Sequence, residues 1–323
     1  MKLFVMKSSS AFGEKVAARL NMPVAQHEEV DFEDGEHKAR PLENVRNEDV
    51  CVIQSLYGDG TLSVNDKLCR LLFFLGALKD AAASRITAVV PYLCYARKDR
   101  KTKPRDPVTT RYMAQLFEAV GVDRVMTVDV HNLQAFQNAF RCQTEHLEAR
   151  GLFARHLMDS LPDEDLVIMS PDIGGIKRAE QLQRLLHTKY SREIPLVFME
   201  KYRSGGQVWG EKVAGEVKDK TVAIVDDLIS TGGTLARAAR ACHEAGARKV
   251  LAMATHGIFV GKPDEKLLED SLQQIVVTNT IPAFRLEQTR TKEKLLVLDV
   301  APLFAEAIRR LYTGGSITEL LEA

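Results

Sequence analysis

The sequence predicts an α/β fold built from mainly parallel sheets covered by helices. Three segments, at 82–91, 121–130 and 246–255, share one order: a helix end with small residues, then a basic residue, then a run of β-branched and other apolar residues. Such near-continuous apolar strands, alternating with helices, are typical of parallel sheets buried on both faces. We therefore expect functional residues at the carboxyl ends of strands, where open α/β sheets bind their ligands.

The length of the chain suits two domains. It has 323 residues, of which 45% are hydrophobic and 27% charged, enough for two sizeable cores. A second series of elements begins with a helix expected at 150–158 and a strand at 163–170. We therefore expect an N-terminal domain at 1–148 and a C-terminal domain at 149–323, whose last segment could pack back on the N-terminal domain.

The charge and the short apolar runs argue against several classes of partner. Lys plus Arg and Asp plus Glu both number 44, so no net field favours nucleic acid or an anionic membrane. The longest apolar run, 71–78, is far too short for a membrane span, and the N-terminal run is too short for a signal peptide. The five cysteines are odd in number and form no Cys-x-x-Cys pair. We expect a cytoplasmic protein that binds neither nucleic acid nor a membrane.

An acidic turn is expected early in the chain, at Phe32–Glu36. Phe32 can stack on a base, while Asp34 and Glu36 can accept hydrogen bonds from an exocyclic amino group such as that of adenine. By itself, the same string also predicts an ordinary solvated turn, and both interpretations stay open.

A dense basic tract follows the strand expected to end near residue 90. Its basic residues are Arg97, Lys98, Arg100, Lys101, Lys103 and Arg105, and Asp99 lies among them. A basic run is usually a solvated loop, although a position after a buried strand suits a polyanionic ligand. No Gly-x-x-x-x-Gly-Lys-[Ser/Thr] segment occurs, so any nucleotide triphosphate would not be held by a Walker loop.

His131 and Asp172 follow two further expected strands, at 124–130 and 166–170. A histidine in such a place is more often a satisfied polar group than a ligand. No spacing of nitrogen and sulfur ligands suits zinc, whereas hard Mg²⁺ prefers oxygen and substrate phosphates.

Lys201 and Arg203 come directly after the apolar run 194–199. If the backbone is extended there, residues i and i+2 point to the same side, so both cations could face one phosphate. The glycines that follow, Gly205, Gly206 and Gly210, would make the rest mobile, as in a lid. An isolated Lys-x-Arg is also a frequent surface pattern.

The most informative segment is Val222–Leu235, a buried strand that ends in two acids, turns through two glycines and opens a helix. Backbone N–H groups of the turn and the helix N-terminus favour an anion. Asp226 and Asp227 repel phosphate but can accept hydrogen bonds from ribose hydroxyls. The expected donors to the phosphate are Thr231, Gly232, Gly233 and Thr234. The segment therefore predicts a sugar-phosphate site, with an ordinary strand-to-helix turn as the alternative.

The string Val-Asp-Asp-x-Ile-x-Thr-Gly-Gly-Thr in this segment resembles the phosphoribosyl-diphosphate (PRPP) loop of the type I phosphoribosyltransferase fold. Four other segments resemble the ribose-phosphate pyrophosphokinase family, also called PRPP synthetases, and they occur in the order of that family. They are Phe32–Glu36, Tyr95–Arg100, Val128–His131 and Ser170–Gly175. Together they make the resemblance specific and nearly end to end.

The resemblance implies two similar phosphoribosyltransferase-like domains and Mg²⁺-dependent synthesis of PRPP and AMP from ATP and ribose 5-phosphate. It implies that ATP is bound by Phe32, Asp34, Glu36, Arg97, Lys98, Asp99 and His131. Ribose 5-phosphate would be bound by Asp226, Asp227, Ser230, Thr231, Gly232, Gly233 and Thr234. Mg²⁺ would be held by His131 and Asp172, while Lys201 and Arg203 would be catalytic residues on a flexible loop.

The sequence departs from the family pattern at a few positions. Lys98 stands where many members carry Gln, Ser230 stands where many carry Asp, and the segments 55–64 and 132–140 also differ. We therefore do not carry over regulation by ADP, AMP or phosphate. The resemblance also implies a homo-oligomer, built from dimers and up to a hexamer, in which the Phe32 turn completes the ATP site of an adjacent subunit.

Two alternatives to a PRPP synthetase remain. The first is a phosphoribosyltransferase that consumes PRPP, for which one domain would suffice. The second is a non-catalytic regulatory paralogue, which would be expected to lose the catalytic cations or metal ligands that this chain retains.

Overall fold

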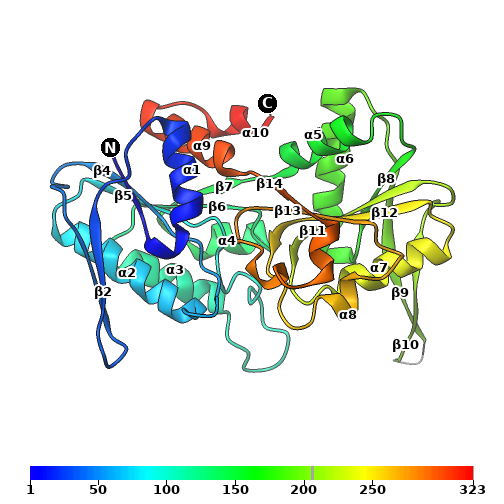
Figure 1. The fold of residues 1–323 in the computed structure, drawn as a ribbon, viewed down its shortest axis with the longest axis horizontal. Coiled ribbons are helices and arrows are strands. Elements are labelled where there is room, and N and C mark those ends of the chain that lie inside the picture. The colour runs from blue at the N-terminus through cyan, green and yellow to red at the C-terminus, as the bar shows by residue number, and fades with distance from the viewer. Residues whose placement is uncertain (205–206, 323) are drawn as a thin grey trace. The chain divides into compact units, whose positions relative to one another are not determined.

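The structure is a computed structural model that describes residues 1–204 and 207–322; at 201–204 and 207–211 it describes the backbone alone. The chain forms two compact units, one of residues 1–148 with the stretch from Ala301 onward, the other of residues 149–300. Each unit contains a mainly parallel sheet with flanking helices (Figure 1), so the predicted α/β class is confirmed. The division into domains at 1–148 and 149–323 stays a prediction.

The first unit is built on a parallel sheet whose described strands run in the order β1-β4-β5-β6-β7. These strands are β1 (Lys2–Val5), β4 (Asp49–Ile53), β5 (Arg85–Val89), β6 (Arg124–Val128) and β7 (Gln143–Leu147). The helices are α1 (Ser10–Leu20), α2 (Val64–Asp80), α3 (Thr109–Ala119), α4 (Leu133–Ala139), α9 (Ala301–Thr313) and α10 (Ile317–Glu322), with a 3₁₀ turn η1 (Lys7–Ser9).

The two faces of this sheet pack against different helices. On one face, Phe74 of α2 and Phe117 of α3 join the strand residues in one core. Because side chains alternate along a strand, Val5 of β1 points to the other face, towards α1. A Cβ on Gly13 would lie 2.1 Å from Cγ1 of Val5, so only glycine allows α1 to approach β1 this closely. The rings of Phe12 in α1 and Phe304 in α9 meet edge to face, with centroids 5.5 Å apart.

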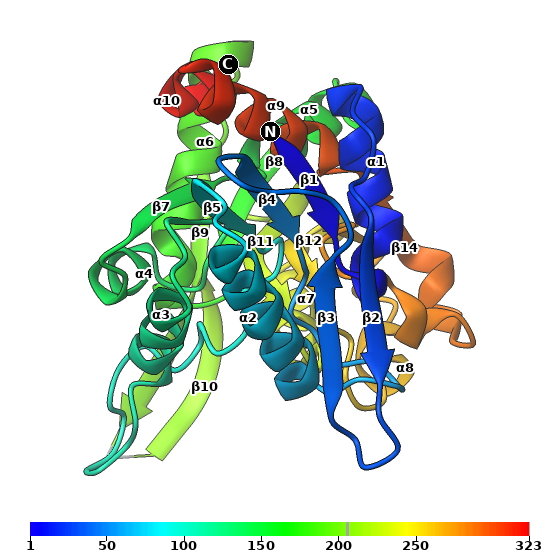
Figure 2. The ribbon, with the colours of Figure 1, turned by 90° about the vertical axis from the view of Figure 1, so that its left-hand side faces the viewer.

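A separate antiparallel hairpin belongs to the same unit. It consists of β2 (His27–Asp31) and β3 (His37–Pro41), and β3 lies beside α2 (Figure 2). Two contacts hold the hairpin on the helix. Asp31 forms an ion pair with Arg70 of α2, and the ring of His37 stacks on that of Phe73 with centroids 5.4 Å apart. The hairpin connection is the segment Phe32–Glu36.

The second unit is built on a larger sheet, in which the described strands run in the order β10-β9-β8-β11-β12-β13-β14. These are β8 (Leu166–Ser170), β9 (Leu196–Ser204), β10 (Gln207–Ala214), β11 (Thr221–Ile229), β12 (Lys249–Gly257), β13 (Gln274–Thr278) and β14 (Leu295–Leu298). All neighbours pair in parallel except β9 and β10.

Helices cover this sheet and connect its strands. They are α5 (Arg150–Ser160), α6 (Ile176–Tyr190), α7 (Gly233–Glu244) and α8 (Asp264–Leu267), with 3₁₀ turns η2 (Ile173–Gly175), η3 (Phe284–Leu286) and η4 (Arg290–Lys294). The expected helix at 150–158 and strand at 163–170 are confirmed by α5 and β8. No helix in the described part of the chain has both the length and the apolar character that a membrane crossing needs.

Candidate functional site

The strand-to-helix turn between β11 and α7 forms as the sequence predicts. Gly232 has φ +80° and immediately precedes the first residue of α7, Gly233. A Cβ on Gly232 would lie 2.6 Å from Cδ2 of Leu267, so both the backbone angle and the packing require glycine there. Thr231 is exposed, whereas Ser230 and Thr234 are partly buried. The turn therefore presents the N-terminus of a twelve-residue helix at the carboxyl end of a buried strand.

The two glycines of this turn have different tasks. Gly232 supplies the left-handed backbone, while Gly233 has no positive φ. A Cβ on Gly233 would meet no protein atom closer than 3.7 Å, where it would touch Nη1 of Arg237. The protein itself thus leaves room for a Cβ at 233, unlike at 232.

The two acids at the end of β11 form a crowded carboxylate pair. Asp227 is buried, with 3% of its surface exposed, and the Asp227 N–H donates to Oδ1 of Asp226 at 2.8 Å. Burial and the neighbouring Asp227 carboxylate raise the pKa of Asp226 to about 8. Nη1 of Arg178 lies 3.5 Å from Oδ1 of Asp226 and 3.7 Å from Oδ1 of Asp227. No sequence pattern pointed to Arg178, which comes from α6.

Asp172 lies in the exposed loop between β8 and α6. Its Oδ1 accepts a hydrogen bond from the Gly175 N–H at 2.9 Å, and its backbone carbonyl accepts one from the Ser170 hydroxyl at 2.6 Å. In the described part of the chain, no hydrogen bond reaches the second carboxylate oxygen. Asp172 therefore shapes the loop with one oxygen and has the other available for a cation.

Lys201 and Arg203 lie on β9, two residues apart. β9 continues to Ser204 and pairs with β10, so the backbone is extended at both residues, which is the condition for residues i and i+2 to point to the same side. The flexible loop that the family resemblance implies stays a prediction. Opposite them on β10 stand Glu211 and Val208. The side chains of Lys201 and Arg203, and the glycines at 205 and 206, lie outside the described residues. Gly210 follows a register shift in β10.

In the first unit, the turn Phe32–Glu36 closes the β2–β3 hairpin. The Phe32 N–H donates to the Glu36 carbonyl at 2.8 Å, and Oδ1 of Asp34 accepts from the Glu36 N–H at 3.0 Å. Gly35 has φ +92°. Phe32 is 49% exposed although it is aromatic, and Asp34 and Glu36 are exposed as well. An exposed ring beside acceptors suits both the solvated turn and a base-binding turn.

The basic loop after β5 is held by an internal ion pair. Nζ of Lys98 lies 2.7 Å from Oδ2 of Asp106, and that carboxylate also accepts hydrogen bonds from Thr102 and from the Lys103 N–H. The Lys98 hydrogen bond and the Thr102 groups hold the pKa of Asp106 well below its usual range. Arg97 is exposed, and no described residue pairs with its guanidinium. Of the two, Arg97 is therefore the cation available to a ligand.

The loops after β5 and β6 are joined to each other. Nδ2 of Asn132 donates to Oδ2 of Asp99 at 2.6 Å, while Oδ1 of Asn132 accepts from the Ala135 N–H and caps α4. His131 is the neighbouring residue and is exposed. The structure thus brings the Arg97–Asp99 segment and the His131 segment to one edge of the sheet.

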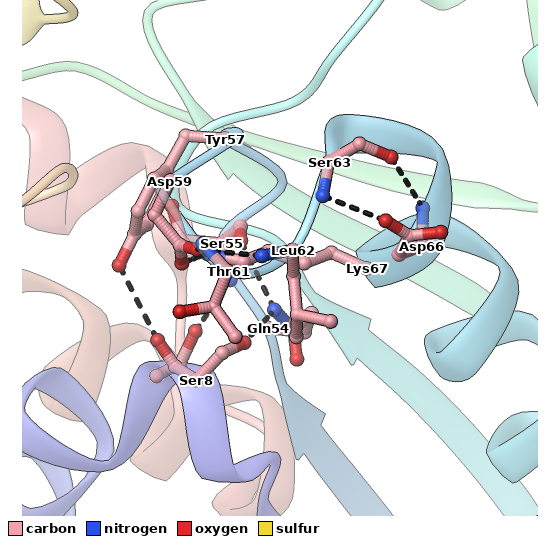
Figure 3. A network of polar contacts seen from close by, with 11 residues as sticks. Ser8, Gln54, Ser55, Tyr57, Asp59, Thr61, Leu62, Ser63, Asp66 and Lys67 are labelled. Atoms are coloured by element: carbon pink, nitrogen blue, oxygen red, sulfur yellow. Dashed lines mark hydrogen bonds and ion pairs between the residues drawn. The ribbon is translucent and has the colours of Figure 1, made fainter. Parts of the chain in front are cut away.

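A third loop of the first unit, at 54–63, is closed by its own side chains (Figure 3). Nζ of Lys67 is fully buried, 2.6 Å from Oδ2 of Asp59 and 3.6 Å from the centroid of the Tyr57 ring. Oδ1 of Asp59 accepts from the N–H groups of Thr61 and Leu62 at 2.8 and 2.7 Å.

The same loop is also tied to the segment after β1. Nε2 of Gln54 donates to the Ser8 hydroxyl at 2.8 Å, and the Tyr57 hydroxyl donates to the Ser8 carbonyl at 3.3 Å (Figure 3). Ser63 and Asp66 form a capping box at the start of α2. Asn65, in the first turn of α2, accepts a hydrogen bond from the Tyr95 hydroxyl, so the ordered helix start supports the loop that carries Arg97.

Within the described residues, no group of three or more His, Cys, Asp or Glu side chains could hold a metal ion. A Mg²⁺ site that uses one carboxylate, one imidazole and substrate phosphates would not need such a group. The pairing of His131 with Asp172 joins residues of different units and stays a prediction.

Comparisons with known proteins place the chain among enzymes of one kind. A family model described as the N-terminal domain of ribose phosphate pyrophosphokinase matches residues 1–121, and one described as a phosphoribosyl synthetase-associated domain matches residues 204–322. The ribose-phosphate pyrophosphokinase of Caldanaerobacter subterraneus subsp. tengcongensis is 39% identical, over 99% of this chain and 97% of that one. The ribose-phosphate pyrophosphokinase of Clostridium acetobutylicum is 37% identical, over 100% of this chain and 97% of that one.

A solved structure agrees with these relatives. The crystal structure of phosphoribosylpyrophosphate synthetase from Mycobacterium smegmatis superposes with a TM-score of 0.87 at 35% identity, and the match covers 97% of this chain and 99% of that one. The likeness therefore extends over both units.

Proposed function

The chain belongs to the ribose-phosphate pyrophosphokinase family, and from that premise we propose that it transfers the terminal diphosphoryl group of ATP to ribose 5-phosphate. The C1 hydroxyl attacks the β-phosphorus and loses its proton, the bond from the β-phosphorus to the AMP oxygen breaks, and PRPP and AMP result. The observation that carries the proposal is the turn from β11 to α7, with its acid pair and left-handed Gly232, in a chain that matches pyrophosphokinases from end to end.

The second unit would bind ribose 5-phosphate. The N–H groups at the start of α7 and the hydroxyls of Thr231 and Thr234 would hold the 5-phosphate, with Ser230 beside them. The carboxylates of Asp226 and Asp227 would accept hydrogen bonds from ribose hydroxyls. This division suits the geometry, because the helix N-terminus is electropositive while the carboxylate pair lies before the turn.

The first unit would bind ATP. The exposed ring of Phe32, with Asp34 and Glu36, would hold the adenine, and Arg97 would bind the triphosphate. Lys98 and Asp99 would act indirectly, since Lys98 pairs with Asp106 and Asp99 accepts from Asn132. Lys201 and Arg203 would neutralise charge as it develops on the transferred group.

Asp172 and His131 would hold Mg²⁺. The donor set fits, because Asp172 retains one carboxylate oxygen that no described residue hydrogen-bonds, and Mg²⁺ completes its coordination with water and phosphate oxygens. The ion would supply neutralisation of the triphosphate charge. The residues of this chain would contribute the alignment of attacker and leaving group.

The two alternatives predict other outcomes of one assay. Purified protein is incubated with ATP and a divalent metal, with and without ribose 5-phosphate, and AMP is measured. We expect AMP only when ribose 5-phosphate is present. A phosphoribosyltransferase would need PRPP and a base, and a regulatory paralogue would release nothing. Either of those results would overturn the proposal.

A substitution at Gly233 separates the two substrates. We expect Gly233→Val to weaken binding of ribose 5-phosphate more than ~10-fold and to leave ATP binding unchanged, because its Cβ meets no protein atom closer than 3.7 Å but would lie where the phosphate is proposed to approach. Calorimetric titration with each substrate measures this, with Gly151→Val on α5, where a Cβ meets nothing within 4 Å, as the matched control. Equal loss of both affinities would mean that the turn supports the whole fold.

We further propose that the active enzyme is a homo-oligomer built from dimers, with up to six subunits, in which the Phe32–Glu36 turn serves a neighbouring subunit. The exposed ring and acids of this turn support the idea. Mixing inactive Phe32→Ala/Glu36→Ala protein with inactive Lys201→Ala protein should restore part of the activity, because some sites would receive two intact contributions. No recovery, although mass spectrometry shows mixed oligomers, would place both contributions in one subunit.

A cytoplasmic location is also proposed. All five cysteines are free thiols, which suits a reducing compartment. Cell fractionation followed by immunodetection tests this, and recovery in a membrane or secreted fraction would contradict it.

A further inference from the structure

Arg178 occupies an unusual place beside the acid pair of the second unit. It lies in the first turn of α6, and its guanidinium reaches the end of β11, where Nη1 is 3.5 Å from Asp226 and 3.7 Å from Asp227. The side chains are 21%, 19% and 5% exposed, so the guanidinium and both carboxyl groups are largely removed from solvent. A partly buried pair of like charges needs a compensating cation, and Arg178 supplies it.

The two distances bear on what Arg178 does. Both exceed the 2.7–3.2 Å range of ordinary N–H···O hydrogen bonds. Arg178 therefore offsets part of the negative charge of the pair without taking up a hydrogen-bonding position on the oxygens measured. A ligand with hydroxyl donors can then approach carboxyl oxygens that a nearby cation already stabilises.

The loop before α6 controls where Arg178 lies. Asp172 accepts the Gly175 N–H at 2.9 Å, and the Ser170 hydroxyl donates to the Asp172 carbonyl at 2.6 Å, which fixes the residues that lead into α6. A Cβ on Gly175 would lie 2.7 Å from Oγ of Ser170, so the loop could not close in this form with a side chain there. The segment that carries Asp172 thus also delivers Arg178 to the acid pair.

We propose that Arg178 is a positioning residue for ribose 5-phosphate: its guanidinium holds Asp226 and Asp227 together, with part of their negative charge offset, in the arrangement that accepts the ribose hydroxyls. This inference rests on the proposed function. It assigns the guanidinium no contact with the 5-phosphate, ATP or the transferred group. Loss of the guanidinium should therefore weaken the binding of ribose 5-phosphate and leave the binding of ATP unchanged.

The test uses the full-length protein with three variants. Arg178→Gln removes the charge, Arg178→Lys keeps it without the planar fork, and Arg184→Gln makes the same change at an exposed position of the same helix. For each, calorimetry gives the Kd of ribose 5-phosphate and of ATP, steady-state kinetics give both KM values and kcat, and thermal melting monitors folding.

We expect Arg178→Gln to raise the Kd and KM of ribose 5-phosphate ~10- to 100-fold, with the ATP values unchanged. Arg178→Lys should recover part of the loss, and Arg184→Gln should match the wild type. If Arg178→Gln does not fold, Arg178→Lys decides the question, through a raised KM for ribose 5-phosphate beside an unaltered KM for ATP.

Two results would overturn the inference while leaving the proposed function intact. One is unchanged ribose 5-phosphate binding in a folded Arg178→Gln protein; the other is an equal loss for both substrates, which indicates a purely structural role. Failure of the wild-type protein to bind ribose 5-phosphate would instead refute the proposed function, and the inference with it.

Discussion

Replacing Lys201 or Arg203 by alanine is expected to lower kcat by ~10²- to 10³-fold, with a smaller change in either KM. The reason is that diphosphoryl transfer needs little covalent chemistry from the protein and depends on neutralising charge that develops in the transition state. Both residues lie two apart on β9, where the extended backbone allows them to act on one group. Initial rates of AMP formation at saturating substrates measure the effect.

The same hairpin provides the control for this experiment. Lys212 is an exposed lysine on β10, and Lys212→Ala should leave kcat near the wild-type value. Thermal melting of each variant shows whether the fold is kept. If kcat is unchanged in both Lys201→Ala and Arg203→Ala, the β9–β10 hairpin has no part in the chemistry.

Removing the fully buried lysine of α2, Lys67, should have the largest effect on stability. Lys67→Ala leaves the Asp59 carboxylate without its ion-pair partner and removes the cation from the Tyr57 ring. We expect a loss of about 3 kcal/mol in the free energy of unfolding, at the low end of the range for breaking a buried pair, because Asp59 is 24% exposed. Denaturant unfolding, followed by circular dichroism, measures it.

Two further variants make this result specific. Lys79→Ala on the same helix breaks an exposed contact with Asp123 at 4.0 Å and should cost no more than ~1 kcal/mol. The double variant Lys67→Met/Asp59→Asn removes both charges, while an amide oxygen can still accept from Thr61 and Leu62, so it should recover part of the loss. A fully stable Lys67→Ala protein would show that the ion pair adds nothing.

The features that depend on local sequence could be predicted, because the residues concerned are neighbours in the chain. The segment from Val222 to Leu235 specifies its own strand, turn and helix through buried apolar residues and a left-handed glycine. Which of the two glycines is left-handed could not be predicted, since Leu267, which excludes a side chain at Gly232, comes from another element.

The contacts that join distant segments were not predictable from the patterns used. Arg178 meets an acid pair on another strand, and Lys98 pairs with Asp106 at the far end of its own loop, so the sequence indicated neither partner. The burial of Lys67 was only weakly indicated by the sequence, because Lys67 continues the apolar face of α2 that includes Leu71 and Leu75. A lysine in such a stripe usually extends its ammonium to water, so burial against Asp59 depends on the loop 54–63.

The fate of the two terminal phosphates of ATP tests the central claim most directly. The protein is incubated with Mg²⁺, ATP and ribose 5-phosphate, and the products are followed by phosphorus NMR. We predict that the β- and γ-phosphorus atoms leave together and appear as a diphosphate on C1 of the ribose, with AMP formed in equal amount. Formation of ADP and a sugar with one additional phosphate would make the protein a kinase of the ordinary type and would contradict the account.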